Sequence, residues 1–446
     1  MKKVNTLPDG NKNTIFRFGG WGWLTIIFCL LMFWFYVGMV NDGTNYLAPA
    51  VAENLGVNKS VILTCNSAAG IIGVLFYIVL GQVNKKIGPS VTAGITTIMA
   101  AIAYWAAGNA SSVAMYLIAM CFVVGGIMTA GYIAGGTLVA QWFPKKKGVI
   151  MGYTTMGHNL ASAFYVPLVM VLFSRLGVRV GVVPICVGAV ILGILILIFQ
   201  KNTPFERGLN PDNVSDNVYQ TEYDTQDDKA TDEAGWTVGK LLRTRELWIA
   251  AVTTGGFQIC SVGVMQQLVS RNIELGFAEV TAVQIMTILA LGGVVGSWLI
   301  GIIDDKIGTK RTMIGFGIWY AIALLLNFTN QMTLVYISLF MIAMGIGGSA
   351  NFTTSLPTSI FGRQGFDLVN SVCFPIQGAV TALCFLVNAA VLHLTNDNLR
   401  YAYIVFAAVA ILVSLVVATI DEHKYNRDWH AADGSLSEVL KEEARL

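Results

Sequence analysis

Long apolar segments separated by short polar ones run along nearly the whole chain. A helix needs about 20 mostly apolar residues to cross a lipid bilayer. Such stretches predict transmembrane helices over residues 18–48, 60–82, 89–108, 112–142, 149–174, 179–200, 246–270, 279–303, 312–329, 331–360, 367–394 and 399–420. The first six precede the longest polar segment and the other six follow it. The pattern therefore predicts an all-α membrane protein with twelve transmembrane helices.

A charged motif recurs in the two halves of the chain. The sequence GQVNKKIG begins at Gly81, and GIIDDKIG begins 220 positions later at Gly301. Self-similarity at a fixed offset indicates two units of similar construction. We expect two pseudo-symmetric six-helix bundles at 18–200 and 245–420, joined by a linker at 201–244 and flanked by tails at 1–17 and 421–446.

The distribution of basic residues predicts the orientation in the membrane. Cytoplasmic loops carry an excess of Lys and Arg. The chain has 28 Lys and Arg residues. If both termini are cytoplasmic, the only ones that fall on the outer side are Lys59, Arg175, Arg179, Arg271 and Arg400. We predict a multi-pass protein of the plasma membrane, which is the inner membrane of a bacterial cell, with both tails and the acidic linker in the cytoplasm.

Composition and motifs narrow the function. The chain is 55% hydrophobic and 12% charged, against about 25% charged for a soluble domain. Its net charge of +2 gives no reason to expect a nucleic-acid partner. The seven cysteines lie in apolar runs without a CxxC pair, and Walker A, HExxH and GxSxG motifs are absent. We expect no enzymatic activity, no cofactor and no metal site.

Two ionisable residues inside predicted spans are candidates for carrying a proton. Ionisable groups at membrane depth are costly, so they mark either a functional site or a satisfied pair. Asp42 lies in the outer half of the first span, and His158 lies near the middle of the fifth. Each could bind and release a proton as the site changes access, and His158 could instead bind an anion. Each also fits a hydrogen-bonded structural role between helices, and Asp42 also fits a helix-end group at the outer interface.

Polar residues in the spans form a second group of candidates. The side chains that we consider as substrate contacts are Asn45, Tyr132, Asn159, Gln258, Gln267, Asn351, Gln377 and Arg271. Uncharged polar residues of this kind more often hold helices together than bind a ligand. Arg271 could attract an anion, and it also fits an arginine that reaches for the membrane interface.

The twelve spans, the motif at 301–311 and its echo at 81–88 resemble the major facilitator superfamily over the whole chain. QWFPKKKGVIMG at 141–152, PFERGLNPD at 204–212 and ELGFAEVTA at 274–282 resemble its oxalate/formate exchanger and monocarboxylate transporter branch. The resemblance implies secondary active transport by alternating access, and we expect a functional monomer. It also implies a cytoplasmic gating latch that contains Asp305, Lys306, Arg311 and Lys86.

Two departures from that branch bear on the substrate. Where the branch often carries an arginine, four residues before the motif glycine, this chain has Ser297, and residues 367–394 contain no Lys or Arg. These departures argue against a small dianion such as oxalate.

We predict that the protein transports a small organic acid across the lipid bilayer. The substrate is monocarboxylate-like, and the class includes bulky aromatic and steroid acids. Transport is coupled to protons or to a counter-substrate. The alternatives are an efflux carrier of amphipathic compounds and a non-transporting membrane sensor.

Overall fold

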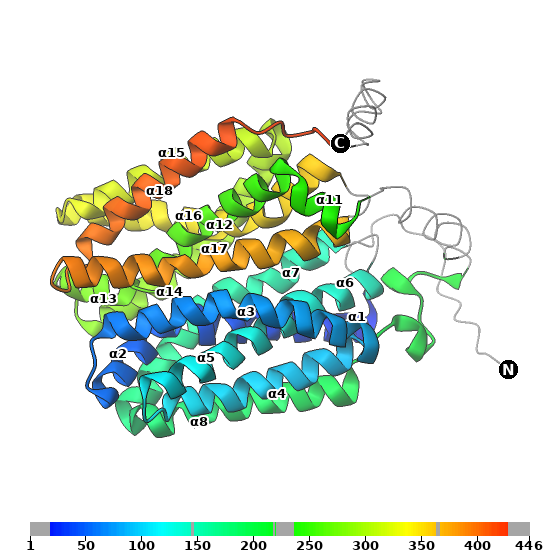
Figure 1. Cartoon of the computed structure of the whole chain (residues 1–446), viewed down its shortest axis with the longest axis horizontal. Helices are drawn as coiled ribbons and strands as arrows, with labels where there is room; N and C mark the ends of the chain where they lie inside the picture. Colours follow the sequence, from blue (N-terminus) through cyan, green and yellow to red (C-terminus); the bar gives the residue numbers. More distant parts are fainter. Residues whose placement is uncertain (1–17, 144–146, 217–218, 220–235, 363–365, 427–446) are drawn as a thin grey trace.

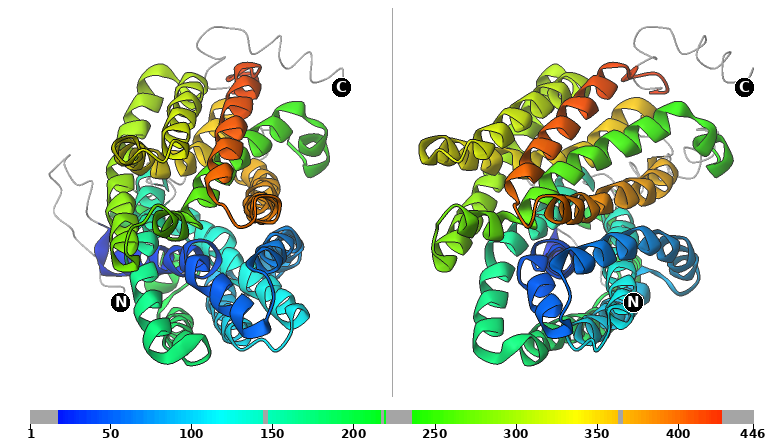
Figure 2. Two further views of the ribbon diagram at one scale, coloured as in Figure 1. Left: turned by 90° about the vertical axis from the view of Figure 1, so that its left-hand side faces the viewer. Right: turned by 60° about the vertical axis from the view of Figure 1, so that its left-hand side comes forward.

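A computed structural model describes the chain except for residues 1–17, 144–146, 217–218, 220–235, 363–365 and 427–446. The predicted N-terminal tail, much of the linker and most of the C-terminal tail therefore lie outside the described residues. Every element in the described part is a helix, and the helices form two bundles that lie side by side (Figure 1). Figure 2 shows the same two bundles from other sides.

The first bundle contains α-helices that are interrupted by short π-helical turns. Its elements are α1 Gly19–Tyr36, η1 Val37–Asp42, α2 Thr44–Leu55, α3 Lys59–Ile87, α4 Pro89–Gly108, α5 Val113–Met128, η2 Thr129–Ala134, α6 Gly135–Trp142, α7 Lys147–Leu160, η3 Ala161–Tyr165 and α8 Val166–Phe199. The turns η1, η2 and η3 are the π-helical ones.

The linker and the second bundle follow. The described linker elements are η4 Pro204–Arg207, η5 Pro211–Asn213 and α11 Val238–Arg243. The second bundle is built from α12 Arg245–Met265, α13 Leu268–Glu274, α14 Glu279–Ile307, α15 Thr309–Phe328, α16 Met332–Phe361, α17 Phe366–Leu394 and α18 Arg400–Ala418.

Twelve spans account for these helices. Ten stretches are long and apolar enough to cross a membrane, and the pair α2–α3, bent by 120°, adds an eleventh. One of the ten, Tyr153–Phe199, contains Gly177 at a φ of 71°. A left-handed residue interrupts a right-handed helix, so this stretch is two spans. The predicted all-α fold with twelve spans in two bundles is confirmed.

The first and seventh spans end differently from the prediction. The first span passes through η1, where the backbone N–H of Gly43 donates to the carbonyl of Gly38 at 3.0 Å, and the chain then continues as α2. The seventh span ends at Met265, and α13 begins a separate short helix at Leu268. Both spans therefore break near the same end of the molecule, where the sequence alone indicated continuous helices.

The two ends of the bundles carry different elements. The linker face carries the start of α1, the end of α8, the start of α12 and the end of α18, on the right of Figure 1. The distal face is the opposite end, which carries α2 and α13 on the left of Figure 1.

The repeat of 220 residues is visible in the contacts at the linker face. Gly88 and Gly308 have nearly equal φ angles of 87° and 88° and separate consecutive spans. The side chain of Asn202 accepts from the backbone N–H of Ser90 at 3.0 Å, and Glu422 accepts from Lys310 at 3.1 Å. Each capping residue therefore comes from the segment after the last span of its half. The two capping residues are 220 positions apart, and so are the two residues that they cap.

Contacts between the bundles follow the same repeat. The hydroxyl of Ser67 on α3 donates to the carbonyl of Ala382 on α17 at 2.6 Å. Thr287, which is 220 positions after Ser67, donates to the carbonyl of Ala163 at 3.0 Å. The two halves thus face each other across a pseudo-twofold axis that runs between them.

Candidate functional site

Three π-helical turns of the first bundle carry the polar residues of the candidate site. A π turn holds one residue more than an α turn and is frequent at functional sites. Asp42 ends η1, Tyr132 lies in η2 and Ser162 lies in η3. These turns belong to the first, fourth and fifth spans, so three spans turn polar side chains toward the interior.

Asp42 is a buried carboxyl group with a hydroxyl partner. Its side chain is 3% exposed and accepts a hydrogen bond from the Ser162 hydroxyl. Ser162 Oγ also lies 3.4 Å from the backbone oxygen of His158, one helical turn earlier. No described Lys or Arg forms an ion pair with Asp42. A buried carboxylate without a cation is costly, so this group is suited to carrying a proton.

His158 is held against the first span by a close helix contact. A Cβ on the neighbouring Gly157 would lie 2.2 Å from the carbonyl oxygen of Leu30, so only glycine allows α7 to approach α1 this closely. The imidazole contacts the ring of Phe33 edge-on at a centroid distance of 4.8 Å. Its Nε2 is buried and has no hydrogen-bond partner among the described residues. The imidazole is therefore positioned with one nitrogen available to a ligand.

Aromatic rings surround the imidazole and reach the second bundle. The Tyr36 and Tyr132 ring centroids lie 6.0 Å and 6.3 Å from that of His158. The ring centroid of Tyr132 also lies 5.2 Å from that of Phe374 of α17. We call the residues Phe33, Tyr36, Asp42, Tyr132, His158, Ser162 and Phe374 the central cluster.

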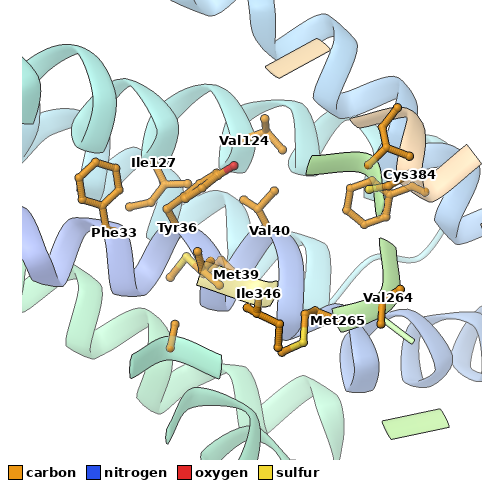
Figure 3. Packing of buried hydrophobic residues seen from close by; sticks show 14 of the residues in the cluster. Phe33, Tyr36, Met39, Val40, Val124, Ile127, Val264, Met265, Ile346 and Cys384 are labelled. Atoms are coloured by element: carbon orange, nitrogen blue, oxygen red, sulfur yellow. The ribbon is translucent and has the colours of Figure 1, made fainter. Parts of the chain in front are cut away.

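Apolar side chains join the halves beside the central cluster. Figure 3 shows Met39 and Val40 beside Met265 and Ile346 of the second bundle. All four side chains are buried. Since Met39 and Val40 lie between Tyr36 and Asp42 along the first span, the halves are in contact at the depth of the cluster.

The predicted polar contacts of the second half are distributed around the interface. Asn159 of the first half points its Oδ1 at α14, 3.4 Å from where a Cβ on Gly293 would lie. Asn351 is paired with Ser297, since the Ser297 hydroxyl donates to Asn351 Oδ1 at 2.9 Å and Asn351 Nδ2 donates to the Ser297 carbonyl at 2.8 Å. Gln377 is buried with Oε1 lacking a described partner, whereas Gln258 is half-buried on α12.

Asn45, Gln267 and Arg271 lie toward the distal face, away from the central cluster. Asn45 donates to the carbonyls of Asp42 at 2.7 Å and Met265 at 2.9 Å. Gln267 accepts from Lys59 at 2.8 Å.

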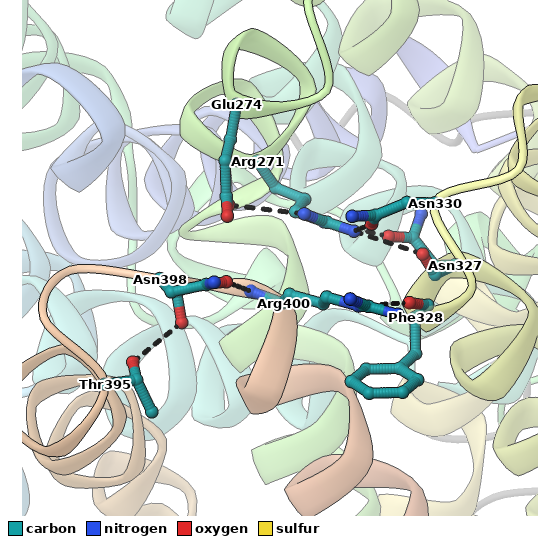
Figure 4. A network of polar contacts seen from close by, with 8 residues as sticks. All are labelled: Arg271, Glu274, Asn327, Phe328, Asn330, Thr395, Asn398 and Arg400. Atoms are coloured by element: carbon teal, nitrogen blue, oxygen red, sulfur yellow. Dashed lines mark hydrogen bonds and ion pairs between the residues drawn. The ribbon is translucent and has the colours of Figure 1, made fainter.

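Arg271 is buried and fully engaged. Its guanidinium donates to the side chain and carbonyl of Asn327, both at 3.1 Å, and to Asn330 at 2.5 Å (Figure 4). It also pairs with Glu274 at 3.3 Å. We therefore leave Arg271 out of the candidate substrate site.

The predicted gating residues lie at the linker face. Lys86, Lys306 and Arg311 are exposed there. Asp305 lies in α14, and its side chain is outside the described ones. Lys86 and Lys306 lie two residues before Gly88 and Gly308, where consecutive spans are joined.

Sequence reasoning missed several residues of the cluster and of the interface. Ser162, Tyr36 and Phe374 look like ordinary members of apolar spans, and only the helix rotation brings them together. Asn202 and Glu422 had a usable signal, because they lie 220 positions apart and follow the sixth and twelfth spans.

Comparison with known proteins identifies related sequences. A family model described as Major Facilitator Superfamily matches residues 23–366. The "Oxalate:formate antiporter" of Oxalobacter formigenes is 26% identical over 352 residues, which cover 76% of this chain and 78% of the relative. The "Nitrate/nitrite transporter NrtP" of a Picosynechococcus species is 29% identical over 118 residues, covering 26% of this chain and 22% of that protein.

Solved structures share the fold at low sequence identity. A D-xylose-proton symporter has a TM-score of 0.63 at 14% identity, with 90% of this chain and 97% of the symporter covered. A bacterial homologue of the human lysosomal transporter Spinster, in an inward-facing and occupied conformation, has a TM-score of 0.62 at 11% identity, with coverages of 90% and 97%.

Proposed function

The chain belongs to the major facilitator superfamily, and from this premise we propose that it carries a monocarboxylate together with a proton across the inner membrane of a bacterial cell. Family membership makes it a membrane carrier rather than an enzyme. The relative that is named an oxalate:formate antiporter supports an organic anion as the substrate. A central cluster whose described residues include no Lys or Arg supports a single carboxylate over a dianion.

The observation that carries the proposal is the environment of Asp42. A monocarboxylate brings one negative charge into a cluster that offers no described cation. A proton on Asp42 removes the negative charge of Asp42 itself, so the substrate carboxylate does not face a second buried carboxylate, which the bilayer interior would make costly. Ser162 holds the carboxyl group in place in both protonation states, because a hydroxyl can donate to a carboxylate and accept from a carboxylic acid.

The remaining groups of the cluster bind the substrate. His158 Nε2 donates a hydrogen bond to one carboxylate oxygen. Tyr132 and Phe374 contact the rest of the acid from opposite halves. Asn159, Gln258, Asn351 and Gln377 line the same interface and adjust the fit. An aromatic surface tolerates an apolar substrate body, so aromatic or steroid acids are included in the substrate class.

Orientation and gating follow from the charges at the two faces. The linker face holds most of the basic residues and is assigned to the cytoplasm. Lys86, Asp305, Lys306 and Arg311 form the cytoplasmic latch, and the halves rock about the cluster in a functional monomer.

Reconstitution tests the proposal. Purified protein in liposomes should accumulate radiolabelled formate, acetate, lactate or benzoate when the outside is acidic, above the background of protein-free liposomes. Asp42→Asn should abolish the dependence on the pH gradient, and Asp42→Glu should retain part of it. Gradient-driven uptake of all four acids at wild-type rates in Asp42→Asn would remove Asp42 from the mechanism.

The aromatic rings around His158 favour one alternative, an efflux carrier of amphipathic compounds. That function predicts lower susceptibility to such compounds in cells that overproduce the protein, and no accumulation of the four acids in liposomes. The two sets of measurements separate the functions.

A further inference from the structure

Three hydrogen bonds join the halves at the distal face. Asn45 donates to the carbonyl of Met265 at 2.9 Å, Tyr46 donates to Glu279 at 3.0 Å, and Lys59 donates to Gln267 at 2.8 Å. We call these contacts the distal gate. The first-half partners lie within 45–59 and the second-half partners within 265–279, which is the same segment 220 positions later. The gate is therefore built from equivalent segments that meet across the pseudo-twofold axis.

Equivalent positions of the distal gate carry opposite charges. Lys59 is the first residue of α3, and Glu279 is the first residue of α14. The two do not pair with each other, because Glu279 accepts from a tyrosine hydroxyl and Lys59 donates to neutral groups. Besides Gln267, the described partner of Lys59 is the Ser270 hydroxyl at 3.3 Å. Asp397 acts on Lys59 through its charge, without an ion pair among the described contacts.

Two donors at this gate lack an acceptor among the described residues. An ammonium group has three N–H donors, and Lys59 uses two of them. Gln267 is 2% exposed, and its Oε1 accepts from Lys59. Its Nε2 has no hydrogen-bond partner in the described part of the chain. A buried amide N–H without an acceptor is costly. A cation and an amide donor on neighbouring side chains are what a carboxylate requires.

Arg271 shows the contrast one helical turn further along. Its guanidinium is saturated by Asn327, Asn330 and Glu274 (Figure 4). Lys59 also lies at the described interface between the halves, but its direct partners are neutral.

We propose that Lys59 and Gln267 form a carboxylate-binding station at the distal gate, which takes the anion before it reaches the central cluster. The proposal rests on the anionic substrate of the proposed function. When the halves separate at this face, the hydrogen bonds of Lys59 to Gln267 and Ser270 open, and the ammonium and amide donors bind the incoming carboxylate between them. The station compensates the charge of the anion on the outer side, and protonation of Asp42 removes a competing negative charge in the centre.

The test compares the two sides of the membrane. Initial uptake rates of the best-transported acid among formate, acetate, lactate and benzoate give a KM for distal-face entry and a KM for linker-face entry in oriented liposomes. Lys59→Gln should raise the distal-face KM about tenfold, the loss expected for one hydrogen bond to a charged group. It should leave the linker-face KM unchanged. Lys59→Arg should stay near wild type. Gln267→Leu should raise the distal-face KM less than Lys59→Gln does, because it removes the amide donor but keeps the cation.

Arg175→Gln is the matched control, because Arg175 is an exposed basic residue that follows the fifth span toward the same face. If Lys59→Gln behaves like Arg175→Gln, or raises both KM values equally, there is no carboxylate station and Lys59 is only a latch. That result would leave proton-coupled uptake and its dependence on Asp42 intact. Failure of all four acids to enter the liposomes would instead overturn the proposed function and this inference with it.

Discussion

Glu422 is predicted to be the strongest single capping residue at the linker face. Its Oε1 accepts from the backbone N–H of Lys310 and from the Ser359 hydroxyl, each at 3.1 Å. It therefore ties the start of α15 to the end of α16. Losing an N-terminal cap costs about 1 kcal/mol. Losing a negative charge there costs a further amount of about 0.3–1 kcal/mol.

These terms give different expectations for different substitutions. Glu422→Ala loses the cap, the charge and the bond to Ser359, and should lower the free energy of unfolding by about 2 kcal/mol. Glu422→Gln keeps an acceptor and should cost about 0.5–1 kcal/mol. Asn202→Ala removes the neutral cap of the first half and should cost about 1 kcal/mol. The two caps lie in different bundles, so their effects should add.

The assay is the apparent melting temperature of the purified protein in detergent, followed by tryptophan fluorescence. For a bundle of this size, 1 kcal/mol corresponds to about 2–4 °C. We expect decreases of about 4–8 °C for Glu422→Ala and about 2–4 °C for Asn202→Ala. Asp421→Asn, which removes the same charge from an exposed neighbour, is the control. The reasoning is refuted if Glu422→Ala melts like Asp421→Asn, or if Glu422→Gln costs as much as Glu422→Ala.

Two further predictions concern packing and pH. Gly157→Ala should lower the melting temperature and slow transport, because the added Cβ would lie 2.2 Å from the Leu30 carbonyl oxygen; Gly136→Ala, with open space at its Cβ, should do neither. Burial alone would lower the pKa of Lys424, but its hydrogen bond to Glu246 and the nearby charges outweigh burial and raise that pKa above 10.5. A raised lysine pKa stabilises the fold below its ordinary value and stops doing so as the pH rises through the higher one. The stability advantage of wild type over Lys424→Met should therefore shrink as the pH rises above 10.5. The advantage itself is small, because the Lys424 side chain is 35% exposed.

The twelve spans could be predicted because a long apolar run is a local property of the chain. The interruptions could not, since they depend on contacts between distant segments. A Cβ on Gly38 would lie 2.4 Å from the ring of Tyr165, so the bend at η1 reflects the packing of the fifth span against the first. The 220-residue repeat was the one long-range signal in the sequence, and it extends to the caps at Asn202 and Glu422.

The candidate site was predictable only in part. Asp42 and His158 stand out because ionisable groups are rare in apolar spans. The partner of Asp42 is Ser162, and no local pattern distinguishes it from other serines. Arg271 illustrates the reverse case, because its partner Asn327 lies 56 positions away and satisfies a group that looked available to an anion.

Lys59 had the same difficulty at the distal face. A lysine at the first residue of a span is typical of a membrane interface. Its contact with Gln267 joins residues 208 positions apart and could be seen only once the halves were placed together.

Proton movement during uptake tests the central claim most directly. Liposomes that contain the protein and a trapped pH-sensitive dye should acidify inside when the transported monocarboxylate is added outside, faster than protein-free liposomes do. The same protein with Asp42→Asn should exchange labelled for unlabelled acid without that protein-dependent acidification. Equal acidification in the two proteins would contradict the account, because the proton would then move without the carboxyl group that we assign to carry it.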